Sequence, residues 1–390
     1  MPPLDGRAFE FVTGRVDFDV VIVGGGIAGA SLGAEIAARR QTLIIEAEFQ
    51  CGYHATGRSA AFWLESYGGA QVAQLTAASR AFLHRPPTDF AEQGFLRTRG
   101  AVHISREQWA ELPTGVEAMR MGRAELDELV PGIRPEWRYA VFEPGCADID
   151  VAGLHAAYLR RFRQRGGQIA TESRLSSAVY SGQRWTVMLE SGPTITTAIL
   201  VNAAGAWADV VADACGARPL GIEPKRRTMV QLRVGRSGLR DLPLVKDESN
   251  TFYFKGEGDR TIWLSPHDEV PTDPCDAAPD EEDVAVAIDR FEHVVDWSVE
   301  GVERRWAGLR TFAPDRLPVY GFDVRTQGLF WCAGQGGFGI QTSPAAAKLA
   351  AATLLGDPVD GITGGIDPAA FSPARFEKKE VSGTSPPPTS

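Results

Sequence analysis

The feature that most constrains this chain is a glycine turn between a β-forming run and a helix near the N-terminus. The run from Asp19 to Val23 leads directly into Gly24-Gly25-Gly26-Ile27-Ala28-Gly29. Gly24, Gly26 and Gly29 have the G-x-G-x-x-G spacing of dinucleotide sites. The spacing predicts a sharp turn at Gly24, close approach of a diphosphate at Gly26 and tight helix packing at Gly29. Free N–H groups at the helix start would hold the phosphates.

A second apolar run, residues 42–45, ends in Glu46, 20 residues after Gly26. An acid at this distance accepts hydrogen bonds from ribose hydroxyls and repels a 2′-phosphate. The stretch therefore predicts a dinucleotide site that disfavours NADP. FAD and NAD both remain open at this point.

Composition narrows the classes of partner. A net charge of −10 argues against nucleic acid. No apolar run approaches the roughly 20 residues that cross a bilayer, and the acidic first 18 residues do not read as a secretory signal. The five cysteines are scattered, without C-x-x-C or metal-ligand spacing. We therefore expect free thiols, no metal site and a cytoplasmic location.

Local patterns predict helices over residues 70–83, 106–130, 151–165 and 279–297, with another starting near Ser343. Asp150 is the expected N-cap of the third. A pair of strands is expected over residues 95–105, and aromatic-rich alternation over 226–234 and 250–265 predicts antiparallel strands. Residues 1–17 are read as an extension, and residues 377–390 as a disordered tail.

The fold class predicted is α/β with an inserted α+β domain. A Rossmann-like dinucleotide-binding domain, doubly wound, is expected from residues 18–90, 147–218 and 304–376. A second, antiparallel-sheet domain for the substrate is expected from residues 91–146 and 219–303.

Five motifs in order resemble a known family: the glycine turn, His54–Ala61 (HATGRSAA), Asn202–Ala208 (NAAGAWA), Trp306–Arg310 (WAGLR) and Gly334–Gln341 (GQGGFGIQ). The chain resembles the D-amino-acid oxidase (DAO) superfamily of FAD oxidoreductases from about residue 18 to 375. Within it, the chain is most similar to bacterial FAD-dependent D-arginine dehydrogenases and their relatives. The resemblance implies FAD as the cofactor.

The resemblance also implies which residues hold FAD. The loop after His54 wraps the pyrophosphate and isoalloxazine through backbone groups, the backbone near Arg174 contacts adenine, and the helix after GQGGFGIQ faces the flavin pyrimidine edge. Covalent members carry a cysteine near the position of Gly308, so FAD is expected to be non-covalent. The implied FAD residues are Gly24, Gly26, Ala28, Gly29, Glu46, Ala47, Ala55, Thr56, Gly57, Arg58, Ser59, Ala60, Ala61, Phe62, Arg174, Gly336, Gly337, Gly339, Ile340 and Gln341.

The implied catalytic residues are Arg310, Tyr253 and Tyr67. A guanidinium binds a carboxylate through two parallel hydrogen bonds, so Arg310 would anchor the substrate carboxylate and Tyr253 would add a hydroxyl. Tyr67 matches a tyrosine on a mobile loop that closes over the substrate. The implied reaction is hydride transfer from the substrate Cα to flavin N5. It gives an imine that hydrolyses to a 2-oxo acid and ammonia and requires no general base.

Departures from the D-arginine enzymes concern the side-chain pocket. Ala101 replaces a glutamate that holds the substrate guanidinium, Phe62 replaces a histidine, and Leu64 replaces a threonine. Arg227 is a further candidate pocket residue. Losing a buried acid and gaining apolar bulk favours apolar or aromatic D-amino acids over D-arginine.

Other functions stay open. One alternative is oxidation of a secondary amine of the glycine or sarcosine type. Another is oxidation of a 2-hydroxy acid, which needs a base for the hydroxyl proton, and no histidine stands near Arg310 in the sequence. A third is a non-catalytic flavoprotein that acts as a binding partner. The electron acceptor is expected to be oxygen, a quinone or another carrier.

Overall fold

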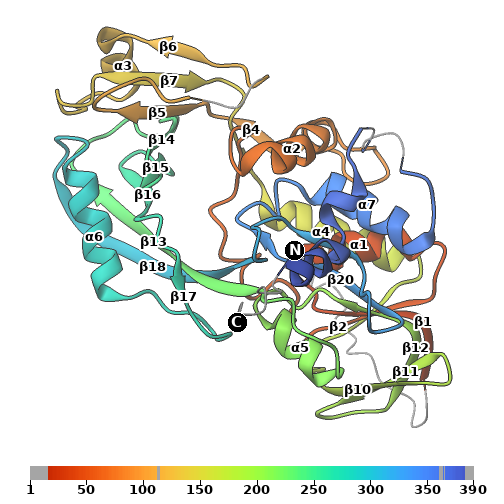
Figure 1. Ribbon diagram of the computed structural model, residues 1–390. Helices are drawn as coiled ribbons and strands as arrows, with labels where there is room; N and C mark the ends of the chain where they lie inside the picture. The colour runs from red at the N-terminus through yellow and green to blue at the C-terminus, as the bar shows by residue number, and fades with distance from the viewer. Residues whose placement is uncertain (1–15, 112–114, 360–362, 364, 383–390) are drawn as a thin grey trace, which may run out of the picture.

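The computed structural model describes residues 16–111, 115–359, 363 and 365–382. Two large sheets dominate it: an eight-stranded sheet and a ten-stranded sheet that lie beside each other in Figure 1. A three-stranded sheet formed by β3 (Phe62–Trp63), β8 (Ala147–Ile149) and β4 (Leu96–Thr98) is the third. The predicted α/β fold with a second sheet domain is confirmed.

The eight-stranded sheet has a parallel core in the order β9-β2-β1-β12-β20. β2 and β20 are fully buried and β1 and β12 are largely buried, which is typical of a parallel sheet. One edge of β12 is shared, because β11 pairs with its first half and β20 with its second half. The strands are β1 (Val16–Val23), β2 (Thr42–Ile45), β9 (Gln168–Ala170), β10 (Leu175–Ser181), β11 (Arg184–Leu189), β12 (Ile195–Asn202), β19 (Val319–Phe322) and β20 (Leu329–Ala333).

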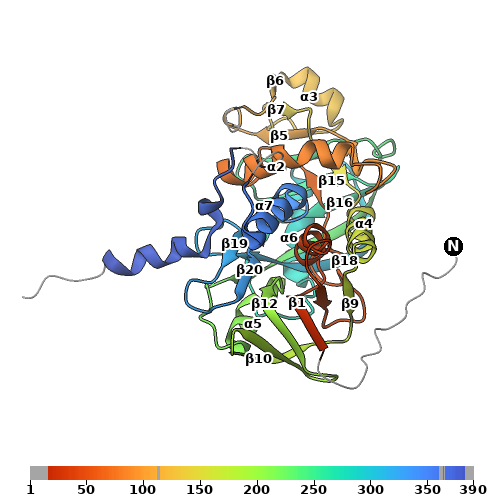
Figure 2. The same cartoon turned by 90° about the vertical axis from the view of Figure 1, so that its right-hand side faces the viewer.

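Helices pack on both sides of this sheet. One face is covered by α1 (Ile27–Ile36), α4 (Val151–Gln164) and α7 (Ser343–Leu355), which cluster together in Figure 2, and α2 (Gly69–His84) packs against α7. The opposite core joins the strands to the β10–β11 hairpin and α5 (Ala208–Ala214), which follows the short 3-10 helix η1 (Gly205–Trp207).

The ten-stranded sheet runs in the order β21-β18-β13-β16-β15-β14-β5-β7-β6, with β17 beside β13. It is antiparallel except where β5 and β14 pair in parallel. One face packs apolar side chains against α6 (Glu281–Glu292) and α3 (Arg123–Leu129). The strands are β5 (Ala101–Ser105), β6 (Met119–Met121), β7 (Tyr139–Glu143), β13 (Glu223–Val234), β14 (Leu244–Asp247), β15 (Tyr253–Gly256), β16 (Thr261–Ser265), β17 (Val270–Pro271), β18 (Val299–Phe312) and β21 (Gln335–Gly336).

Most predicted elements are confirmed, and α4 begins as expected, because Asp150 Oδ1 accepts the Gly153 N–H at 2.9 Å. The long helix predicted over 106–130 is wrong: among the described residues of that range only α3 is helical, and β6 lies before it. Helix-breaking Pro113, Gly115 and Gly122 explain this difference. Residues 112–114 lie outside the described residues.

The two strands predicted over 95–105 exist, but they belong to different sheets: β4 pairs with β8, whereas β5 pairs with β7 and β14. Gly100, with φ of +79°, redirects the chain between them. β18 also runs across the expected domain boundary at residue 304, so residues 304–312 extend the ten-stranded sheet.

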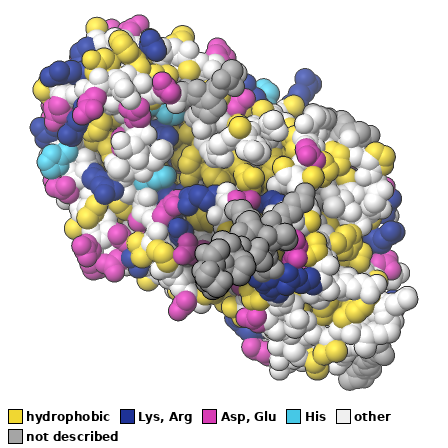
Figure 3. All heavy atoms as spheres, in the orientation of Figure 1, with side chains coloured by type: hydrophobic (Ala, Val, Ile, Leu, Met, Phe, Trp, Pro, Cys, Tyr) yellow, Lys and Arg dark blue, Asp and Glu magenta, His cyan; other side chains and the backbone are white. Residues whose placement is uncertain are grey.

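The expected tails differ in part from the structure. Val16 and Asp17 already belong to β1, and residues 1–15 lie outside the described residues. Residues 377–382 fall within the 3-10 helix η4 (Pro373–Ser382), whereas 383–390 are not described. No helix in the described part of the chain is both long and apolar enough to span a membrane. On the face shown in Figure 3, acidic and basic side chains are interspersed.

Candidate active site

The predicted glycine turn stands between β1 and α1, and its geometry requires glycine at two positions. Gly24 has φ of +104°, and a Cβ there would lie 2.5 Å from the carbonyl oxygen of Ala203. A Cβ on Gly29 would lie 2.0 Å from the Gly24 oxygen. Thr56 Oγ1 accepts the Ile27 N–H at 3.0 Å, so the following loop is fixed to the start of α1.

Glu46 ends β2 beside this turn. Its carboxylate accepts the N–H groups of Gly25 at 2.9 Å and Glu48 at 3.0 Å. An ionised carboxylate offers about four acceptor positions, so Glu46 can still accept from ribose hydroxyls. His155 of α4, missed by the sequence analysis, holds the Gly25 carbonyl at 2.9 Å. Burial lowers the pKa of His155, so its ring is neutral and Nε2 donates.

A cavity of about 540 Å³ runs from this turn to the ten-stranded sheet. Its walls combine exposed glycine backbone, the Glu46 carboxylate and small residues of the 55–60 loop, which suit a dinucleotide. The predicted FAD residues that line it are Gly24, Gly26, Ala28, Glu46, Ala47, Ala55, Thr56, Arg58, Ser59, Ala60, Arg174, Gly336, Gly337, Gly339 and Ile340; Gly29, Gly57, Ala61, Phe62 and Gln341 lie outside its walls.

Two of the predicted FAD residues use their side chains to hold the walls in place. Arg58 Nη1 donates to the carbonyl of Ala277 at 2.9 Å, and its Nη2 pairs with Asp276. Gln341 is buried and turned away from the cavity: Oε1 accepts the Leu64 N–H at 3.2 Å, and Nε2 donates to Thr76 Oγ1 at 2.9 Å. The Gln341 side chain therefore positions the segment that follows the FAD loop.

The far end of the cavity is formed by the inner face of the ten-stranded sheet, which carries the predicted substrate residues. Arg310 of β18 donates from Nη1 to Tyr67 Oη at 2.9 Å. Tyr253 of β15 lies with its ring centroid 5.6 Å from that of Phe62. Arg227 of β13 stands opposite Gly308. Leu64 and Ala101 join Tyr253 in one apolar cluster, so the structure brings the predicted set together.

Both phenols keep a proton that can reach a substrate. The Tyr67 oxygen accepts from Arg310, which leaves its own O–H free to donate. The Tyr253 hydroxyl donates to Met229 Sδ at 3.1 Å, and a thioether is a weak acceptor that a carboxylate readily replaces. The Arg310 fork and these two hydroxyls form a donor set for one carboxylate.

The electrostatics of this end are strongly positive. Burial alone would raise the pKa of Tyr67, but the charges of Arg310, Arg227 and Lys246 outweigh it and hold that pKa below its ordinary value. Lys246 of β14, missed by the sequence analysis, stands opposite Tyr253 in the sheet. The predicted apolar pocket is therefore incomplete, because two cations accompany its aromatic walls.

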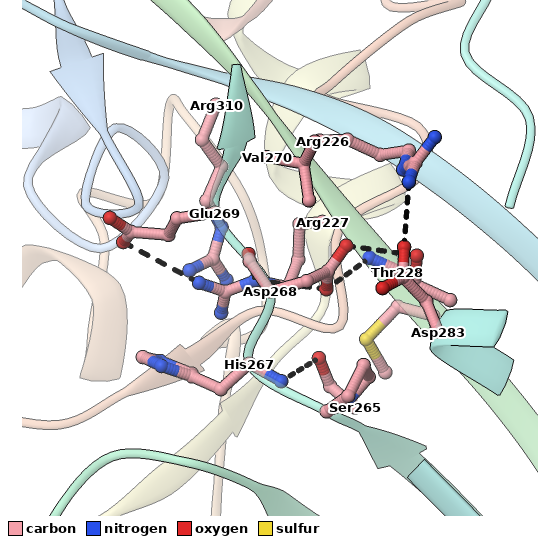
Figure 4. A network of polar contacts seen from close by, with 12 residues as sticks. Arg226, Arg227, Thr228, Ser265, His267, Asp268, Glu269, Val270, Asp283 and Arg310 are labelled. Carbon is pink, nitrogen blue, oxygen red and sulfur yellow. Dashed lines mark hydrogen bonds and ion pairs between the residues drawn. The ribbon is translucent and has the colours of Figure 1, made fainter. Parts of the chain in front are cut away.

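His267 is a second missed residue. It follows β16 with φ of +54°, and its ring centroid lies 5.7 Å from that of Tyr253 and 6.4 Å from that of Tyr67. Burial and the charges of Arg227 and Arg310 lower the pKa of His267 to about 2, so the ring is neutral. His267 is far from Arg310 in the sequence, but the fold brings it close to Arg310, contrary to the expectation from the sequence (Figure 4).

A buried acid anchors the segment that carries Tyr67. Glu143 of β7 accepts the N–H groups of Glu65 at 3.1 Å and Ser66 at 3.3 Å through Oε1. Its other oxygen accepts from His103 Nε2 at 3.1 Å. Burial lowers the pKa of His103, and this neutral ring donates to the carboxylate. These contacts fix Tyr67 beside Arg310.

Cysteines and metals can be placed in the same way. Gly308 lines the cavity where covalent relatives were expected to carry a cysteine, and Cys275, free and exposed, lines the cavity elsewhere. All five cysteines are free. Across the described residues, no group of three His, Cys, Asp or Glu side chains is arranged to hold a metal ion.

Comparison with known proteins identifies the family of this chain. The family model described as "DAO: FAD dependent oxidoreductase" matches residues 19–353, which takes in the glycine turn, both sheets and Arg310. The chain belongs to the DAO family of FAD-dependent oxidoreductases. FAD is therefore the cofactor of this DAO-family protein, and the cavity walls fit it.

Three distant relatives match most of the chain. FAD-dependent oxidoreductase domain-containing protein 1 of Bos taurus is 24% identical, covering 93% of this chain and 85% of its own. A glycine oxidase of Pseudomonas putida is 24% identical over 91% of this chain and 98% of its own. The L-proline dehydrogenase structure from P. horikoshii has a TM-score of 0.78 at 20% identity, covering 94% of this chain and 99% of that one. It shows a shared fold.

Proposed function

We propose that this DAO-family protein oxidises the Cα–N bond of a D-amino acid, and that D-arginine is a poor substrate. The observation that carries the proposal is a donor set: Arg310 and Tyr253 line the FAD cavity, and Tyr67 is hydrogen-bonded to Arg310. This set suits a carboxylate. Two nearby cations, Arg227 and Lys246, disfavour a cationic side chain.

The residues of the site would act by orienting the substrate and by changing the pKa of its ammonium group. FAD, when bound, would supply the hydride acceptor for the substrate Cα–H, and the resulting imine would be hydrolysed by water to a 2-oxo acid and ammonia. Arg310 and the two phenols would fix the carboxylate and so orient the adjacent C–H. The surrounding cations would lower the pKa of the substrate ammonium, which favours the neutral amine. Its proton would pass to solvent.

The pocket residues bear on the substrate side chain. Phe62 and Leu64 provide the apolar surface on which the preference for apolar or aromatic side chains rests, and Arg227 and Lys246 add positive charge to the pocket. The D configuration and the nearer likeness to D-arginine dehydrogenases rest on the motifs. Relatives named for glycine and L-proline support amino acids as a class, so both enantiomers belong in the test.

Two other substrates stay in competition. A secondary amine of the glycine or sarcosine type is favoured by the relatives named glycine oxidase. His267 favours a 2-hydroxy acid as another candidate substrate, because a neutral imidazole beside Tyr253 can accept a hydrogen bond from a hydroxyl. A pKa near 2 makes it a weak base, and for this reason the amine remains the first choice.

Anaerobic flavin reduction tests the proposal. The yellow holoenzyme is mixed with D-phenylalanine, D-methionine, D-arginine, glycine, sarcosine, L-proline and D-lactate. We expect bleaching by D-amino acids, slow bleaching by D-arginine and none by D-lactate. Arg310→Ala should bind FAD and lose the bleaching. If D-arginine or D-lactate reduces the flavin fastest, the proposal is overturned. Admitting air afterwards separates oxygen from a quinone or other carrier as acceptor.

The free cysteines also support the cytoplasmic location expected from the sequence, because disulfides persist mainly in oxidising compartments. Cell fractionation would test it.

A further inference from the structure

Arg227 is a buried cation with unused donors. Its side chain is 4% exposed and lines the same cavity as Arg310. Nε donates to the backbone carbonyl of Asp268 at 2.8 Å, but neither Nη1 nor Nη2 has a hydrogen-bond partner within the described structure. Buried guanidinium nitrogens normally find acceptors, so these two atoms point to a ligand.

The neighbouring acids leave those two nitrogens unsatisfied. Asp268 Oδ1 lies 3.7 Å from Arg227 Nε, and its carboxylate is held by the N–H of Thr228 at 2.8 Å and the hydroxyl at 2.9 Å. Glu269 Oε1 lies 3.6 Å from Arg227 Nη2, while both Glu269 oxygens accept from Arg316 at 2.9 Å. Figure 4 shows Thr228, Asp268 and Glu269 around Arg227.

The charges around Arg227 show which cations lack an ion pair. Arg227 lies near Asp268, and Arg316 pairs with Glu269. Arg310 and Lys246 form no ion pair within the described residues; burial lowers the pKa of Lys246, and the nearby carboxylates of Asp247 and Glu143 oppose that shift. One substrate carboxylate would pair with Arg310. A second anionic group on the substrate would supply the acceptor that the Arg227 nitrogens lack.

The two cations, Arg227 and Lys246, lie on the same face of the ten-stranded sheet. Opposed residues of a sheet share a face. Tyr253 stands opposite Lys246, and Arg227 stands opposite Gly308, so both cations belong to the inner face that carries the substrate residues. The positive charges of Arg227 and Lys246 both help to lower the pKa of His267.

We propose that the preferred substrate carries two anionic groups: Arg310 with Tyr67 and Tyr253 holds one carboxylate, and Arg227 with Lys246 holds the second. The inference rests on the proposed function, and it names acidic amino acids such as D-aspartate and D-glutamate as the substrate class. The rival arrangement has Arg227 and Arg310 gripping the same carboxylate, with no use for a second.

Binding of unreactive acids tests this without turnover. FAD-loaded enzyme is titrated at fixed ionic strength with malonate, succinate and glutarate, and with acetate, propionate and butyrate, while the flavin spectrum is followed. We expect one diacid to bind at least tenfold more tightly than the monoacid of similar length. R227Q and K246Q should each bring the ratio of diacid to monoacid affinity toward one, and R227K should retain it.

R233Q is the matched control, because Arg233 lies on β13 outside the cavity walls and pairs with Glu303; it should keep the ratio. If no diacid exceeds its monoacid in the wild type, or if R227Q weakens both series equally, the second subsite is refuted. Should R227Q fail to fold, the wild-type series and K246Q still decide.

Turnover separates this inference from the proposed function. D-aspartate and D-glutamate are compared with D-alanine and D-norvaline by kcat/KM. Rapid turnover of D-alanine without any advantage for the acidic pair refutes the subsite and leaves the amine oxidation standing. Tight diacid binding with no flavin reduction by any amine refutes the oxidation and leaves the subsite standing.

Discussion

Tyr67 is a residue whose protonation should be visible in binding. Its oxygen accepts from Arg310, so only its own proton can reach a ligand carboxylate. Three cations hold its pKa below the ordinary tyrosine value despite burial. Loss of the proton removes a donor and adds a negative charge beside the ligand. Affinity is therefore complete while the phenol is protonated and falls as pH rises through the Tyr67 pKa.

Competitive inhibition by butyrate measures this, because butyrate has no amine to titrate. We expect its Ki to rise on the alkaline side below pH 10, and Tyr67→Phe to bind more weakly at neutral pH without that rise. His267 should cause no change in the Ki of butyrate between pH 5 and 9, because its pKa is about 2. A Ki that stays flat to pH 10 in the wild type contradicts the role of the phenol.

At the scale of elements, the site depends on a segment held between two sheets. Glu143 of β7 accepts two N–H groups from residues 65–66, and Gln341 accepts the Leu64 N–H from the opposite side. A hydrogen bond to a charged acceptor contributes about 1.5–3 kcal/mol. Glu143→Ala should therefore lower kcat/KM at least about tenfold, mainly through KM, with FAD content unchanged.

Glu128→Gln is the control for this prediction, since Glu128 is exposed on α3. Glu143→Gln, which keeps one acceptor oxygen, should lie between the wild type and the alanine variant. If Glu143→Ala loses FAD in parallel with activity, Glu143 supports the whole cavity rather than the Tyr67 segment.

At the scale of the whole molecule, the sequence revealed what depends on neighbours along the chain. The turn at Gly24 and the cap at Asp150 are set by residues within a few positions of one another, and both are confirmed. Lys246 and His267 carry no such signal. They reach Tyr253 only because β14, β15 and the turn after β16 lie together in the ten-stranded sheet, which no local pattern encodes.

The same contrast explains the wrong helix expected over 106–130 and the separate sheets of the two strands expected over 95–105. Charged faces over 106–130 resemble a helix, yet Pro113 and Gly115 interrupt it. The strands on either side of Gly100 are adjacent in sequence, but each finds its partners in a different sheet. Pairing between distant strands, rather than local propensity, decides both the domain limits and the charge of the substrate pocket.

The cavity gives a prediction about FAD and one thiol. Burial raises the pKa of Cys51, Cys215 and Cys332 to about 12. It also raises the pKa of Cys146 well above the ordinary thiol value, whereas Cys275 is exposed on the cavity wall. With Gly308 at the expected attachment position, FAD should be released by acid precipitation. Iodoacetamide should label Cys275 first in the apoprotein and more slowly in the holoprotein, as peptide mass spectrometry would show. Flavin remaining on the precipitated chain contradicts non-covalent binding.

The anchoring of residues 64–67 has a mechanical meaning. Glu143 belongs to one sheet, and Gln341 leads into a helix that covers the other, so the segment bridges a seam. Any small rotation of one body against the other would be transmitted to the phenol of Tyr67. Relative motion of the two sheets would then move the Tyr67 phenol toward or away from the bound substrate, and so couple this motion to substrate binding and release.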